Sequence, residues 1–205
     1  MDVFQAVLFF AFSATITPGP NNIMILSSGL NYGVRASLPH LFGICLGFPL
    51  MVLLVGLGFG LVFERWPALH YWIKLAGVLY LLYLAWKIGS ASPTRIESGH
   101  ARPFGFWQAA AFQWVNGKAW IMASGAVAAF ISLQTQQPLG DLLQICAAFL
   151  LVAFPCVGLW LGFGAWLKQY LNQPLYRRLF NILMALLLVG SVLPVIQELV
   201  QELLS

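Results

Sequence analysis

The sequence has very few charged residues. Only 8% of its 205 residues are charged, ten Lys and Arg against six Asp and Glu, whereas a soluble domain carries about 25%. So little charge cannot cover a surface that faces water, which excludes a soluble globular enzyme, a disordered chain and a secreted disulfide scaffold. Because 60% of the residues are apolar, we predict an all-α integral membrane protein in a lipid bilayer.

The apolar residues gather into six long segments. They cover about residues 3–30, 38–63, 69–88, 104–133, 139–167 and 179–199. One membrane crossing takes about 20 apolar residues, so the sequence predicts six transmembrane helices in a single integral membrane domain over residues 1–205. The longest loop is expected at residues 89–103, and another loop at residues 168–178.

The two halves of the chain resemble each other in layout. Ile44-Cys45, followed by Phe48, is echoed 101 residues later by Ile145-Cys146, followed by Phe149. Residues 1–88 and 104–205 are therefore interpreted as two repeats of three helices. Because three is an odd number, the second repeat is predicted to be inverted in the membrane, which is a recurring transporter design.

The first and fourth segments are interrupted at corresponding places. The first contains Thr17-Pro18-Gly19-Pro20-Asn21-Asn22, and the fourth contains Asn116-Gly117-Lys118. Proline and glycine disfavour a regular helix, so Pro18, Gly19, Pro20 and Gly117 are predicted to break the helices. Paired breaks of this kind indicate a binding site near the middle of the membrane. Two ordinary kinks with packing roles are the alternative.

Polar side chains are concentrated at the two breaks. We predict that the substrate is bound by Thr17, Asn21, Asn22, Gln113, Asn116 and Lys118. Helix N-termini favour an anion, whereas freed carbonyls suit an ammonium group, so the site fits a small zwitterion such as an α-amino acid. The alternative for Lys118 is a charge that snorkels or pairs with Asp141. Asn21 and Asn22 are also suited to capping the helix that follows.

Basic residues predict the orientation of the chain in the membrane. The first, third and fifth loops and their edges contain Arg35, Lys87, Arg95, Arg102, Lys168, Arg177 and Arg178. The second and fourth contain Arg65 and Lys74. Loops rich in Lys and Arg face the cytoplasm, so both termini are predicted to be periplasmic. This bias accounts for the net charge of +4, and no nucleic-acid partner is expected.

No binding role is predicted for the cysteines, the histidine His40 or the paired glycines. Cys45, Cys146 and Cys156 lie in apolar segments without a C-x-x-C pair, so no metal and no cofactor are expected. His40, near the end of its segment, is expected to be solvated. Close helix packing, within one chain or in a homodimer, is predicted by three glycine pairs, Gly43 with Gly47, Gly56 with Gly60, and Gly158 with Gly162.

The motifs carry a family resemblance over nearly the whole chain. Thr17-Pro18-Gly19-Pro20-Asn21 resembles the hallmark of the LysE/RhtB family of amino-acid exporters. Asn116-Gly117-Lys118-Ala119-Trp120 and Leu84-Ala85-Trp86-Lys87 resemble two further patterns of that family. Gly117 stands where the family usually has proline, so it permits a break without enforcing one.

The resemblance implies amino-acid export across a bacterial inner membrane, driven by the proton-motive force. Phe106-Trp107 and the spacing of Gln113 and Asn116 are similar to the cysteine/O-acetylserine branch, with homoserine/threonine and leucine exporters as close alternatives. One lysine and no carboxylate at the breaks favour a small neutral amino acid. No catalytic motif is present, so no enzyme is expected. A transmembrane thiol-redox conduit, drawing on Cys45 and Cys146, and a non-transporting membrane scaffold are the other hypotheses.

Overall fold

The computed structural model describes residues 3–59, 65–90, 102–131, 137–171 and 173–204. Every regular element in these residues is a helix, so the prediction of an all-α chain is confirmed. Most of the loop expected at residues 89–103, with Arg95, lies outside the described residues, and so does Gly60.

The helices follow the predicted segments closely. They are α1 (Val3–Ile16), α2 (Pro20–Tyr32), α3 (Val34–Leu54), the π-helical turn η1 (Val55–Phe59), α5 (Pro67–Gly89), α7 (Phe106–Phe112), the 3₁₀ turn η2 (Gln113–Val115), α8 (Gly117–Phe130), α9 (Pro138–Leu167) and α10 (Pro174–Leu204). The expected loop at residues 168–178 is shorter than predicted. Pro174 begins α10, which places Arg177 and Arg178 in its first turns.

A single residue forms the corner between α2 and α3. Gly33 has a φ of 81°, a backbone conformation that side chains disfavour, and its N–H donates to the Gly29 carbonyl at 2.9 Å. The chain therefore reverses direction at once, and α3 begins at Val34 rather than at residue 38.

Four of the described helices are long and apolar enough to cross a membrane. They lie at Val34–Gly58, Tyr71–Gly89, Pro138–Leu167 and Pro174–Gln201. α1 and α2 pass the same test together as one broken span, bent by 57°. The described residues thus give four or five candidate spans. α7 and α8 do not add another by this test, so the sixth span remains a prediction from the sequence.

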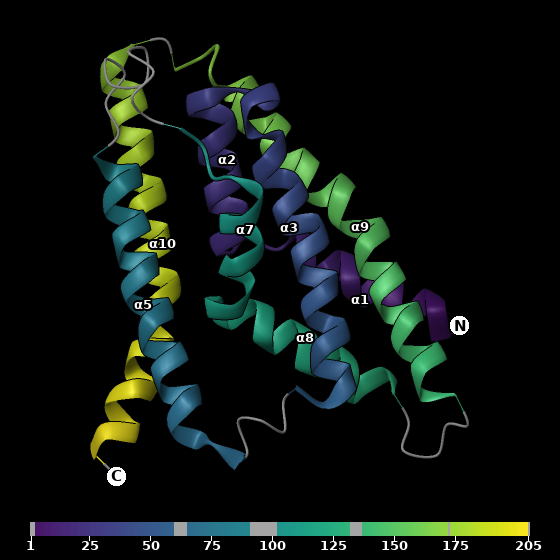
Figure 1. Ribbon diagram of the computed structural model, residues 1–205. Helices are drawn as coiled ribbons and strands as arrows, with labels where there is room; N and C mark the ends of the chain where they lie inside the picture. The colour runs from purple at the N-terminus through teal and green to yellow at the C-terminus, as the bar shows by residue number, and fades with distance from the viewer. Residues whose placement is uncertain (1–2, 60–64, 91–101, 132–136, 172, 205) are drawn as a thin grey trace.

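The helices form two groups that share one end (Figure 1). α5 packs against α10, while α9 packs against α1, α2 and α3, and α3 also contacts α7. α1 and α8 run across the direction of the long helices. The α2–α3 corner, the C-terminal ends of α5 and α9, and the start of α10 lie together at the top of the view. We call this the basic end, because most of the Lys and Arg residues lie near it.

Glycines allow α2 and α9 to approach each other closely. A Cβ atom added to Gly164 would overlap the backbone oxygen of Leu26, and one added to Gly29 would overlap the backbone of Leu161. α2 is therefore held directly against the backbone of α9. This contact fixes the position of the residues at the beginning of α2.

The predicted glycine pairs have different surroundings. Cβ atoms added to Gly43 and Gly47 would meet α7 residues, including Ala110, so this pair packs within the chain as expected. Gly158 and Gly162 have no neighbouring atom within 4 Å of an added Cβ. Packing of Gly158 and Gly162 against other described residues is therefore not observed, and their face of α9 is open.

Candidate functional site

The first break separates α1 from α2 at residues 17–19. Pro20 is the first residue of α2, a position where the missing N–H of proline costs nothing. The structure therefore begins the helix earlier than the motif suggested, and it places Asn21 and Asn22 in the first turn of α2. Gly19, just before this turn, supplies no side-chain cap.

The carbonyls freed at the end of α1 have donors. The Asn22 Nδ2 atom donates to the carbonyls of Thr15 and Thr17, at 2.8 and 2.9 Å. The Lys118 Nζ atom donates to the carbonyls of Thr17 and Pro18, at 2.6 and 3.3 Å. The lysine of the second break thus lies on the backbone of the first.

A tryptophan completes this set of donors. The Trp160 Nε1 atom, from α9, donates to the Ile16 carbonyl at 3.2 Å. Sequence reasoning did not identify Trp160, since one tryptophan among eight in an apolar chain carries no signal of its own. Its role follows only from the packing of α9 against α1.

The second break lies at Asn116. This residue is extended, with φ −91° and ψ 104°, between η2 and α8. Gly117 is the first residue of α8, so the chain bends beside this glycine without using a conformation reserved for glycine. An interruption of the fourth segment is therefore present, at the residue before the one that the motif emphasised.

A reciprocal amide pair joins the two breaks. The Asn21 Nδ2 atom donates to Gln113 Oε1 at 2.8 Å, and the Gln113 Nε2 atom donates back to Asn21 Oδ1 at 3.2 Å. Gln113 Nε2 also donates to the Ala109 carbonyl at 2.8 Å, and the Gln113 side chain is fully buried. Gln113 therefore positions Asn21 rather than lining the site itself.

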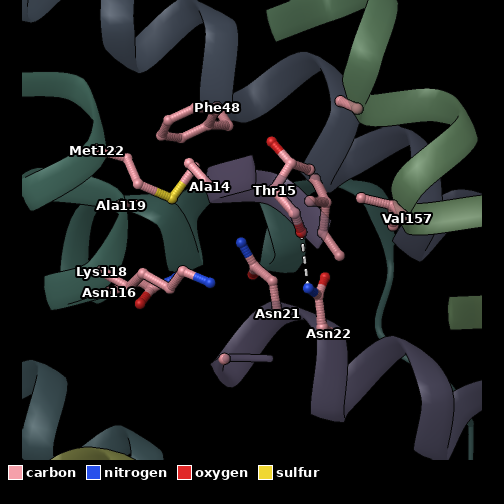
Figure 2. A pocket seen from close by; sticks show the side chains of 13 residues that line it. Ala14, Thr15, Asn21, Asn22, Phe48, Asn116, Lys118, Ala119, Met122 and Val157 are labelled. Carbon is pink, nitrogen blue, oxygen red and sulfur yellow. Dashed lines mark hydrogen bonds between the residues drawn. The ribbon is translucent and has the colours of Figure 1, made fainter. Parts of the chain in front are cut away.

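The two breaks enclose a cavity of about 40 Å³, which Figure 2 shows from close by. Since a water needs about 10–15 Å³ by such a measure, the cavity holds only a few waters in this conformation. Its lining comprises Ala14, Thr15, Gly19, Asn21, Asn22, Ile44, Phe48, Asn116, Lys118, Ala119, Met122, Ala153 and Val157. Four predicted binding residues, Asn21, Asn22, Asn116 and Lys118, are thus brought together.

The other predicted residues, except Gly19, lie outside this lining. Thr17 is exposed, and its hydroxyl donates to the Ser13 carbonyl, so only its backbone carbonyl takes part in the site. Pro18 contributes its carbonyl to Lys118, and Pro20 and Gly117 begin the helices that carry the polar groups. The apolar lining from α3 and α9 was missed, because those helices are apolar on every side.

Two polar atoms of the lining have no hydrogen-bond partner within the described residues. They are Thr15 Oγ1 and Asn116 Oδ1, and both are buried. A buried acceptor without a donor is costly, so each atom is available to a polar ligand. The N-termini of α2 and α8, which lack side-chain caps, border the same cavity and favour an anion. The lining therefore suits a molecule carrying both a donor and an anionic group.

Metal binding has no support at this site. Within the part of the chain that the structure describes, His, Cys, Asp and Glu do not form a group of three or more that fits a metal ion. Cys45, Cys146 and Cys156 are free, and Cys45 and Cys156 are buried.

Comparison with known proteins finds a matching family model and several similar proteins. The family model described as LysE type translocator matches residues 12–196. The cysteine/O-acetylserine efflux protein of Escherichia coli (strain K12) is 38% identical over 179 residues, which cover 85% of this chain and 87% of the relative. The protein of that name from Shigella sonnei (strain Ss046) matches with the same identity and coverage. No solved structure matches.

Proposed function

Because the chain belongs to the LysE family of translocators, it is an amino-acid efflux transporter and not an enzyme, and we propose that it exports small neutral amino acids of the cysteine/O-acetylserine type. Homoserine/threonine or leucine are the alternative substrates within the same class. Export runs from the cytoplasm across the bacterial inner membrane.

The cavity between the two breaks carries this proposal. It combines a lysine, two uncapped helix N-termini and two unpartnered polar atoms in a chain that is otherwise poor in polar groups. Asn21, Asn22 and Asn116 supply amide groups, while Ile44, Phe48 and Val157 supply an apolar wall. A small amino acid presents the matching ammonium, carboxylate and short side chain.

The position of Lys118 suggests how the substrate is received. Its ammonium group donates hydrogen bonds to the carbonyls of Thr17 and Pro18, which are the groups best suited to bind a substrate ammonium. Two cations repel each other on the same pair of carbonyls, so the substrate ammonium replaces that of Lys118 there. The released lysine then pairs with the substrate carboxylate. Because the present cavity holds only a few waters, this exchange also widens the site.

The proposed topology has six spans in two inverted repeats, with both termini in the periplasm. Its support is the packing pattern: α1 contacts α9, while α7 contacts α3. If residues 1–88 and residues 104–205 are related by a two-fold axis, α1 corresponds to α7 and α3 corresponds to α9. The axis then converts the contact of α1 with α9 into the contact of α7 with α3. The basic end then faces the cytoplasm, as expected from its Lys and Arg residues.

Proton coupling and a homodimer complete the proposal. The cavity lining contains no carboxylate among the described residues, so we place the proton-carrying step outside this lining.

For the homodimer, the open face of α9 at Gly158 and Gly162 offers a close-packing surface of the kind that transmembrane helices use. A Gly158→Cys variant is expected to cross-link between two copies in membranes, whereas the same change at Gly164 is not.

The function is tested by accumulation in everted membrane vesicles, whose cytoplasmic face is outward. Vesicles with the protein receive a panel of labelled amino acids, with and without a proton gradient. We expect gradient-dependent accumulation of cysteine or O-acetylserine, above that of lysine and arginine. Accumulation that ignores the proton gradient would remove proton coupling, and a preference for lysine would remove the neutral-substrate assignment.

A further inference from the structure

A second polar cavity lies at the opposite end of α2 from the first. It has a volume of about 40 Å³, and its lining includes Ser27, Ser28, Asn31, Lys87, Arg102 and Phe104. These residues come from α2, from the last turn of α5 and from the segment before α7. The elements that carry these residues meet near the basic end of the molecule (Figure 1), so the cavity lies near this end.

One residue of the lining, Asn31, carries a buried acceptor without a donor in the described residues. Asn31 is only 5% exposed, and its Nδ2 atom donates to the Ser27 carbonyl, to Ser27 Oγ and to Asn181 Oδ1, at 3.0, 3.2 and 3.2 Å. These bonds fix which end of the amide faces which way. The Asn31 Oδ1 atom has no hydrogen-bond partner within the described residues. A ligand N–H group would satisfy it.

Further buried polar side chains lie beside the lining of this cavity. His40, which we expected to be solvated, is fully buried, and its Nδ1 atom lies 3.0 Å from Ser28 Oγ. Its ring also packs on Phe104, with 5.3 Å between ring centroids. Asn181, on α10, is fully buried as well. Asn31 is thus fixed by α2 and α10, while His40 of α3 fixes the neighbouring lining residue Ser28.

Two cations also line this cavity. Lys87 and Arg102 both line it, and the Lys87 Nζ atom lies 6.0 Å from the centroid of the Phe104 ring. A lysine in the last turn of a helix complements the helix dipole, which explains Lys87 alone. It does not explain a second cation in the same lining, or the unpartnered amide oxygen of Asn31.

We propose that this cavity is a second amino-acid site, which binds the substrate before the cavity between the two breaks does. Lys87 and Arg102 hold the carboxylate, and Asn31 Oδ1 accepts from the ammonium. The proposal rests on the proposed function and adds a second binding site to the transport pathway. Asn21 and Asn31 are ten residues apart in α2, which corresponds to about 15 Å along the helix. The substrate therefore moves along α2 from one cavity to the other.

The test uses initial rates of uptake of labelled L-cysteine, kept reduced, into everted vesicles. In a Lys87→Gln/Arg102→Gln variant we expect KM to rise about tenfold, equivalent to 1.4 kcal/mol, with the maximal rate largely retained. A Lys87→Arg/Arg102→Lys variant keeps both charges and is expected to keep KM. L-Cysteine methyl ester lacks the carboxylate, so its potency as a competitor should fall much less than that of L-serine in the Gln variant.

The control removes two charges from the same end outside the cavity, with Arg35→Gln/Lys168→Gln, and is expected to leave KM unchanged. An unchanged KM in the Lys87/Arg102 variant, with normal uptake by the unmodified protein, overturns the second site and leaves the proposed function standing. No uptake by the unmodified protein overturns both. A KM difference that vanishes in phosphatidylcholine vesicles without anionic lipid assigns the cations to lipid phosphate and also overturns the second site.

Discussion

The amide pair that joins the two breaks is expected to stabilise the folded protein measurably. Asn21→Ala removes one partner and leaves the fully buried Gln113 side chain with an unpaired oxygen. Leaving a buried polar group unpaired costs about 1–3 kcal/mol, and we expect a loss of unfolding free energy in that range. Gln113→Ala is expected to cost at least as much, because it also leaves a void.

The coupling between the two residues isolates the pair itself. Interhelical hydrogen bonds in a membrane protein average about 0.6 kcal/mol in double-mutant cycles. The two bonds between Asn21 and Gln113, at 2.8 and 3.2 Å, therefore predict a coupling of about 1.2 kcal/mol. The double variant should be less destabilised than the sum of the single variants by this amount.

The assay is reversible unfolding in mixed micelles with added SDS, followed by tryptophan fluorescence. The control cycle combines Asn21→Ala with Ser191→Ala, whose hydroxyl bonds to the Leu188 carbonyl within its own helix. That cycle should show additive effects. If the Asn21–Gln113 coupling is also near zero, the two breaks are not joined by this pair, and the construction of the site is wrong.

Two further predictions test packing and the rival chemistry. Gly164→Val forces a side chain into the backbone of Leu26 and should cost about 3 kcal/mol or more, whereas Gly190→Val on α10 faces open space and should change stability by less than about 0.5 kcal/mol in the same unfolding assay. Replacement of all three cysteines by alanine should leave vesicle uptake of labelled serine near the unmodified rate. A loss of that uptake would favour the thiol-redox hypothesis. The replaced residues are Cys45, Cys146 and Cys156.

The sequence predicted the two breaks because their causes are local. Proline and glycine limit the backbone wherever they stand, so Pro20 and Gly19 mark the first break without knowledge of the fold. The polar groups at both breaks were equally visible against an apolar background. Pro174 carries the same kind of signal and begins α10, but the neighbouring basic residues had favoured a longer loop there.

The partners of those groups could not be predicted, because they depend on contacts between distant segments. Lys118 donates to carbonyls about 100 residues away, and Trp160 reaches α1 from α9. Helices that are apolar on every side give no pattern to show which face is packed. Gly158 and Gly164 illustrate this limit, since one faces open space and the other touches the backbone of α2.

The central claim, that the substrate is bound where Lys118 meets the first break, is tested most directly by two matched lysine variants. Lys74 lies near the start of the candidate span Tyr71–Gly89, where its Nζ atom is 3.3 Å from Glu198. In everted vesicles with equal amounts of inserted protein, Lys118→Met is expected to reduce uptake of labelled cysteine by more than about tenfold, the loss of 1.4 kcal/mol or more of interaction. Lys74→Met is expected to retain uptake. Normal uptake by Lys118→Met would contradict the account.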